Sequence, residues 1–79
     1  NGEQAMNAYV EIDPRVCGGK PVIRGTRIPL TVIVDQLADV GSVGGLLEKY
    51  PELATDQVVG ALRYCHSVIE HTEIDSAEA

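Results

Sequence analysis

The sequence of 79 residues has no tryptophan and no phenylalanine, and its aromatic side chains are Tyr9, Tyr50 and Tyr64. Its core must therefore consist of Val, Ile, Leu and Ala. No apolar run approaches the ~20 residues of a membrane-spanning helix, and no signal peptide is recognisable, so we expect a cytoplasmic protein without membrane contact. Because so small a core supplies little stability, we also expect a homodimer.

Metal-binding patterns are also missing. The two cysteines, Cys17 and Cys65, are far apart, and neither lies in a C-x-x-C motif, which argues against a zinc site. His66 and His71 are five residues apart, which places them on different faces of a helix. We therefore predict no metal site.

A nucleotide-binding loop is the next motif that the sequence lacks. Gly18-Gly19-Lys20 has part of the phosphate-loop pattern, but Pro21 follows the lysine where serine or threonine is needed. No helix begins there, so an anion would gain nothing from a helix dipole. No serine has a recognisable histidine partner either, and we predict neither a cofactor nor enzymatic activity.

Basic residues are scarce, because six Lys and Arg stand against twelve Asp and Glu, giving a net charge of −6. Residues 14–34 nevertheless carry four basic residues and no acid. General acidity opposes nucleic-acid binding, whereas this local basic segment leaves a limited anion contact open.

The same basic segment is unusually rich in proline and glycine. Glycine permits positive φ and proline fixes φ, so the backbone path is tightly constrained. The residues predicted to shape its turns are Gly18, Gly19, Pro21, Gly25 and Pro29.

Short strands are predicted at residues 9–13, 21–23 and 27–28. In the first strand, Val10 and Ile12 alternate with polar neighbours and should share the buried face. The other two strands should form a compact hairpin in which Gly25 takes a positive φ.

Three helices are predicted to follow. The first spans 32–40, with Thr31 as N-cap and Gly41 as its C-terminal stop. The second spans 43–50 with Ser42 as N-cap, and the third runs from Ala54 or Thr55 to about residue 71. The spacing of apolar residues predicts these buried stripes: Ile33, Leu37 and Val40; Leu46, Leu47 and Tyr50; Val58, Leu62, Cys65 and Ile69.

Only about four residues separate the second and third helices, which is helix-turn-helix spacing. A recognition helix reads bases from its N-terminal half, and here Gln57 could pair with adenine and Arg63 with guanine or phosphate. Asp56 would be repelled by phosphate. The predicted nucleic-acid-binding residues are Arg15, Lys20, Arg24 and Arg27 for phosphate, with Gln57 and Arg63 toward bases.

The run Ile12-Asp13-Pro14, followed by residues 17–29, Cys-Gly-Gly-Lys-Pro-Val-Ile-Arg-Gly-Thr-Arg-Ile-Pro, resembles the hallmark of a small bacterial family called domain of unknown function 433. Tyr50-Pro51-Glu52-Leu53, with Val58, Ala61-Leu62 and Tyr64, is similar to that family's helical half. The resemblance implies a mainly α, homeodomain-like three-helix bundle with a helix-turn-helix, preceded by a short β-strand and a β-hairpin.

The resemblance also implies an antitoxin of a type II toxin–antitoxin system, similar to the partners of PIN-domain ribonucleases. Such a protein would bind operator DNA as a homodimer and neutralise a toxin protein. The sequence departs from the family at Gly44 and Gly45, where acidic residues are common. It also has Ala54 where threonine is common, so that Thr55 would cap the third helix.

We expect a single domain over residues 9–72, with residues 1–8 outside it as a frayed or added segment and 73–79 as an acidic tail. The alternative function is a protein-interaction module for dimerisation or toxin binding, without DNA binding. The net charge favours this alternative, while the basic segment and the helix spacing favour operator binding.

Overall fold

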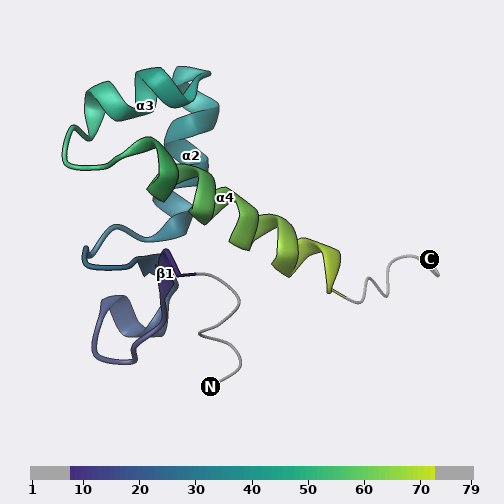
Figure 1. The fold of residues 1–79 in the computed structure, drawn as a ribbon. Coiled ribbons are helices and arrows are strands. Elements are labelled where there is room, and N and C mark those ends of the chain that lie inside the picture. Colours follow the sequence, from purple (N-terminus) through teal and green to yellow (C-terminus); the bar gives the residue numbers. More distant parts are fainter. Residues whose placement is uncertain (1–7, 73–79) are drawn as a thin grey trace.

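The computed structural model describes residues 8–72 (Figure 1). The chain order is β1 (Val10–Glu11), a 3-10 turn η1 (Cys17–Gly19), β2 (Val22–Ile23), α2 (Leu30–Val40), α3 (Val43–Lys49) and α4 (Thr55–Glu70). The predicted mainly helical fold with a small β element before it is confirmed. Residues 1–7 and the predicted acidic tail, 73–79, lie outside the described residues.

β1 and β2 form an antiparallel pair, with Val10 opposite Ile23 and Glu11 opposite Val22. Val10, Val22 and Ile23 are all buried, so both strands contribute to the core. The prediction that Ile12 shares the buried face was wrong, because its side chain is 53% exposed. The strand ends at Glu11, and the alternation of faces ends with it.

The predicted hairpin over residues 21–28 forms only in part. Its turn is present, with Gly25 at φ 84° and the Ile23 amide donating to the Ile28 carbonyl at 3.0 Å. Residues 27–28 are not a strand, however, and a single bridge joins Val22 to Pro29. Proline has no N–H to continue a ladder, which explains why the pairing stops there. The strand partner of β2 is therefore β1.

The turn η1 has an unusual backbone. Cys17, Gly18 and Gly19 have φ angles of 52°, 67° and 91°, three successive residues in the left-handed region. This explains the Gly-Gly pair, because other residues rarely adopt such angles. The Cys17 thiol donates to the Arg27 carbonyl at 3.4 Å and so ties this turn to the segment before α2.

α2 begins two residues earlier than predicted, at Leu30 instead of Val32. Its N-cap is Pro29, whose carbonyl accepts from the amides of Val32 and Ile33 at 3.0 and 3.3 Å. Thr31 therefore lies inside the first turn, and its predicted role as N-cap was wrong. A proline with extended backbone angles already sets the helix entry. The predicted stop is confirmed, since Gly41 has φ 86°.

The start of α3 was predicted correctly, because the Ser42 hydroxyl accepts from the Gly45 amide at 3.0 Å. The N-cap of α4 is Ala54, so the prediction of Thr55 as the cap was wrong. Alanine has no side-chain acceptor. Instead, the Gln57 side-chain carbonyl reaches back and accepts from the Ala54 amide at 2.7 Å, which stabilises the first turn.

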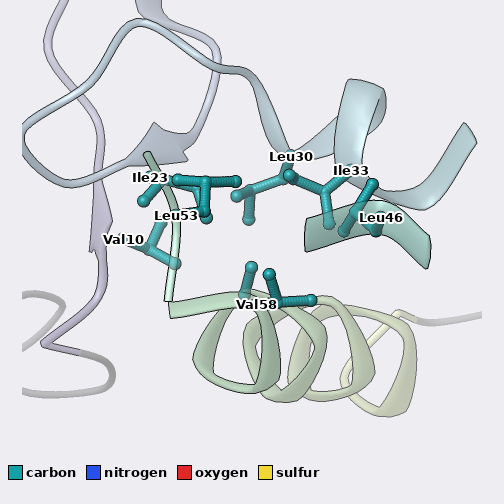
Figure 2. Close-up of a cluster of buried hydrophobic side chains, with 8 residues drawn as sticks. Val10, Ile23, Leu30, Ile33, Leu46, Leu53 and Val58 are labelled. Carbon is teal, nitrogen blue, oxygen red and sulfur yellow. The ribbon is translucent and has the colours of Figure 1, made fainter. Parts of the chain in front are cut away.

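The core lies where the β element and the three helices meet, and Figure 2 shows Val58 of α4 pointing into it. Its buried residues are Val10, Val22, Ile23, Leu30, Ile33, Leu46, Leu53, Val58 and Ala61. All are aliphatic, as the composition predicts. Among the described residues, no single helix is long and apolar enough to cross a membrane. α2 and α3 taken together have the length and apolar composition of a membrane span, but the chain bends by 115° between them.

The predicted core stripe of α4 is only partly correct. Val58 is fully buried, Leu62 and Cys65 are half-buried, and Ile69 is 70% exposed. Figure 1 shows the reason, because the last turns of α4 extend past the rest of the fold. The stripe therefore continues beyond the elements that could cover it.

Candidate functional site

An open groove of about 640 Å³ lies between α2 and the last turns of α4. The α4 wall consists of Tyr64, Cys65, Val68 and Ile69. The α2 wall includes Val34, Asp35 and Ala38. Among the described residues that line the groove, Asp35 is the one that carries a charge.

The sequence builds this groove from two helical stripes. Tyr64 and Val68 are four residues apart on α4, and Val34 and Ala38 are four apart on α2, so each pair follows one side of its helix. The α2 pair lies beside the core stripe that contains Ile33. α2 is thus apolar over a wider arc than the core alone requires.

The apolar side chains of the groove are substantially exposed. Val34 is 45%, Val68 is 47% and Ile69 is 70% exposed. Single exposed apolar residues are ordinary, but several in one concave surface mark an interaction site. Burial raises the pKa of the Cys65 thiol, which favours its neutral form and keeps the groove uncharged at this position.

Sequence reasoning did not find this groove. It assigned Cys65 and Ile69 to the core and did not consider Val34 or Ala38. The available signal was length, because α4 has 16 residues whereas α2 has 11 and α3 has 7. An apolar stripe that follows the longest helix extends beyond the ends of the shorter helices packed beside it.

Of the six predicted nucleic-acid-binding residues, Arg15 forms an ion pair within its own turn. Its Nη2 lies 3.0 Å from Oδ2 of Asp13, and its Nε donates to Oδ1 at 3.1 Å. These hydrogen bonds lower the pKa of Asp13. The Arg15 side chain is 89% exposed, so the pair is a surface one that stabilises the fold little.

Arg24 holds the N-terminal strand in place. Its Nε donates to the Ala8 carbonyl and its Nη2 to the Val10 carbonyl, both at 2.8 Å. The Arg24 backbone amide adds a third bond, to the Tyr9 carbonyl at 2.8 Å. Arg24 is therefore a structural residue, and a phosphate contact would compete with these bonds.

The side chains of Lys20, Arg27 and Arg63 are exposed and form no hydrogen bond or ion pair within residues 8–72. Lys20 and Arg27 lie in the loops on either side of β2, whereas Arg63 is on α4. These three are the members of the predicted set whose charge is available to an external anion.

The N-terminal half of α4 is partly covered on one side by Tyr9. The Tyr9 hydroxyl donates to Oδ2 of Asp56 at 3.1 Å, which raises the pKa of Tyr9. The Tyr9 ring also lies over Gly60, where an added Cβ would come within 2.4 Å of Cδ2. Of the two residues predicted to contact bases, Gln57 is engaged in capping its own helix, whereas the Arg63 side chain is exposed.

Within the described part of the chain, no group of three or more His, Cys, Asp or Glu side chains is arranged to hold a metal ion. Both cysteines are free thiols. The prediction that the protein has no enzymatic activity stays a prediction.

The three helices and the short antiparallel pair define a small, mainly helical domain with a β element in front. Residues 10–65 match the family described as "Protein of unknown function (DUF433)", and the chain belongs to this family. The family assignment made from the sequence motifs is therefore confirmed.

A crystal structure of a DUF433 member protein from Anabaena variabilis ATCC 29413 is similar to this chain, with a TM-score of 0.73 and 33% identity. The similarity covers 89% of this chain and 69% of that one. The uncharacterised protein y4eO of Sinorhizobium fredii (strain NBRC 101917 / NGR234) is 35% identical over 54 residues, or 68% of this chain. That match spans 24% of the curated relative, so this chain corresponds to about a quarter of it.

Proposed function

We propose that this chain is an antitoxin-like protein-interaction module whose α2–α4 groove holds an amphipathic helix of a protein partner. The observation that carries the proposal is the groove itself, with Val34, Val68 and Ile69 exposed on its two walls. The antitoxin-like character rests on the sequence resemblance, which also implies a toxin protein of the PIN-domain ribonuclease type as a partner of the chain, without assigning that toxin to the groove.

An amphipathic helix suits this groove for two reasons. Two helical walls whose apolar residues repeat every four positions present one apolar, concave surface, and helix-in-groove complexes use a surface of this kind. The near absence of charge also matters, because the centres of protein interfaces are depleted of charged residues. Asp35 is the exception, and it favours a partner helix with a basic residue opposite it.

The test is a titration of the ¹⁵N-labelled chain with a model amphipathic peptide of leucine and lysine, followed by NMR. We expect shifts centred on Val34, Tyr64 and Val68. The Val34→Glu variant should lose these shifts because it places a carboxylate in the apolar wall. Ile12→Glu is the matched control, since Ile12 is an exposed apolar residue outside the groove.

The same samples are examined by sedimentation, because a groove already filled by a second copy would admit the peptide only as the dimer dissociates. Shifts at the groove, or release of monomer, support the proposal. Shifts confined to the loops of the β element, or no response by either method, would overturn it.

Operator DNA binding by a homodimer is the second candidate. It is favoured by the side chains of Lys20, Arg27 and Arg63, which are unpaired within residues 8–72. Fluorescence anisotropy on the duplex upstream of the gene, against a scrambled duplex, tests it. Lys20→Ala and Arg27→Ala should each weaken binding and flatten its salt dependence by about one unit of slope. If both variants bind like the wild type, the assignment of phosphate contacts is wrong.

Arg24→Ala is a poor test of DNA contact, although the sequence nominates it equally. Its guanidinium donates to the carbonyls of Ala8 and Val10, so its removal loosens the strand β1 as well. A loss of DNA affinity in that variant would not distinguish a phosphate contact from a displaced strand.

A further inference from the structure

We infer that the helix held by the α2–α4 groove is α4 of a second copy of this chain, so that two chains form a two-fold symmetric homodimer. The inference rests on the proposed function, because it names the partner of the same groove. It assigns Val68 and Ile69 of each copy to the α2 wall of the other.

The groove is self-complementary in its parts. One wall is a protruding ridge, because α4 extends past the rest of the described fold (Figure 1). This part of α4 carries Ile69, whose side chain is 70% exposed. The other wall is the outer side of α2, where Val34 and the small Ala38 leave room for a ridge. In a two-fold symmetric dimer, the ridge of each copy packs against the α2 wall of the other. Both ridges and both walls are then buried in one interface, and no surface is left to bind a third copy.

Charge restricts which surface two copies can share. Each chain carries −6, so two copies repel one another over most orientations. Of the groove-lining residues within 8–72, Asp35 is the one with a charged side chain. On α4, Arg63, His66 and Glu70 are not among the residues that line the groove. Nε2 of His66 lies 3.6 Å from Oε2 of Glu70. The groove is thus a surface by which two acidic chains can meet with little repulsion.

The chain's own terminal segments fit the groove poorly by composition. Residues 73–79 carry three acids and one large apolar residue, Ile74, and their charge would oppose Asp35. Residues 1–7 offer one large apolar side chain, Met6. Neither segment has a stripe of apolar residues at helical spacing, whereas α4 has one.

Within residues 8–72, the last turns of α4 also lack packing from the rest of the fold. Beyond Cys65, Val68 and Ile69 are exposed, and a helix end without tertiary packing is marginal in water. Packing against α2 of a second copy supplies that support. Because two helices per copy make a small interface, we expect a dissociation constant on the order of micromolar.

The first experiment is sedimentation equilibrium of the chain over a range of concentrations, with Ile69→Glu and Ile12→Glu. The two substitutions make the same chemical change at two exposed isoleucines, one in the groove and one outside it. We expect Ile69→Glu to raise the dissociation constant at least tenfold and Ile12→Glu to leave it within about twofold. Circular dichroism of both variants confirms that they remain folded.

The second experiment tests which surfaces meet. In a background of Cys17→Ser and Cys65→Ala, a Val34→Cys chain is mixed with an Ile69→Cys chain and oxidised. Heterodisulfide formation well above that of an Ile12→Cys and Ile69→Cys mixture supports contact between α4 and the α2 wall. Equal cross-linking in both mixtures would overturn that arrangement.

The outcomes separate this inference from the proposed function. A monomer at all accessible concentrations, or a dimer insensitive to Ile69→Glu, overturns the homodimer assignment. If the model peptide still binds the groove of that protein, the proposed function stands with another partner helix. If neither the peptide nor a second copy engages the groove, both proposals fail.

Discussion

The two halves of α4 belong to one helix, yet the core-facing apolar side chains of the first half are buried and the last apolar side chains of the second half are exposed. In the first half, Val58 and Ala61 are completely buried. In the second half, Val68 and Ile69 continue the apolar pattern but are 47% and 70% exposed. The comparison teaches that periodicity defines an apolar face, while the length of the neighbouring elements decides whether that face is covered.

The largest expected effect comes from making the same substitution in each half. Val58→Ala removes two buried methyl groups and should lower the free energy of unfolding by about 2–3 kcal/mol. Val68→Ala should lower it by less than about 0.5 kcal/mol, because its site is half exposed. Urea denaturation at a concentration that favours the monomer measures both values. Equal losses would show that the two halves are equally packed.

A second and smaller effect is expected at Gly60, which lies in the first half of α4 under the Tyr9 ring. Alanine is the better helix former by about 1 kcal/mol. A Cβ there would nevertheless meet Cδ2 of Tyr9 at 2.4 Å, so we expect Gly60→Ala to destabilise the protein by about 1–3 kcal/mol.

The double variant shows whether the Tyr9 ring is the cause. A Tyr9→Gly background removes the ring and also Cβ of Tyr9, which lies 2.9 Å from the added Cβ. In that background Gly60→Ala should become neutral or stabilising, as helix propensity alone predicts. A double-mutant cycle by thermal denaturation measures this change of sign. If Gly60→Ala costs the same with and without the ring, steric contact with Tyr9 does not explain the glycine.

The smallest expected effect concerns the hydroxyl that joins β1 to α4. The hydrogen bond to Asp56 raises the pKa of Tyr9 in the folded state. The stability that this bond contributes is therefore fully present below the unfolded pKa of about 10 and is lost as the pH rises through the higher folded pKa. The melting temperature should fall more steeply between about pH 9 and pH 11 in the wild type than in Tyr9→Phe. Identical profiles would mean that the hydroxyl contributes no pH-dependent stability.

The sequence predicted those elements that depend on local chemistry. Gly41 ends α2 and Ser42 begins α3 because left-handed backbone and hydroxyl capping are properties of single residues. Thr31 and Thr55 failed as caps for a different reason. Pro29 is the N-cap of α2, and at the start of α4 the Gln57 side chain accepts from the Ala54 amide. Neither helix start therefore uses a threonine hydroxyl as its cap.

The functional surface was less accessible to sequence reasoning. The sequence assigned Lys20, Arg24, Arg27 and Arg63 to nucleic-acid contact without distinguishing Arg24 from the others, and that assignment stays a prediction. Only the fold brings the Arg24 guanidinium to the carbonyls of Ala8 and Val10, which are 16 and 14 residues away in the chain. The groove was missed because it depends on how far α4 extends beyond α2, and that relation is a tertiary one.

The placement of the three tyrosines gives the protein a set of built-in optical reporters. With no tryptophan, its near-ultraviolet absorption and fluorescence arise from Tyr9, Tyr50 and Tyr64. Tyr9 lies between β1 and α4, Tyr50 packs on the core at the end of α3, and Tyr64 lines the groove. Single Tyr→Phe variants would therefore resolve strand release, core loosening and groove occupancy as separate spectroscopic signals, without any attached dye.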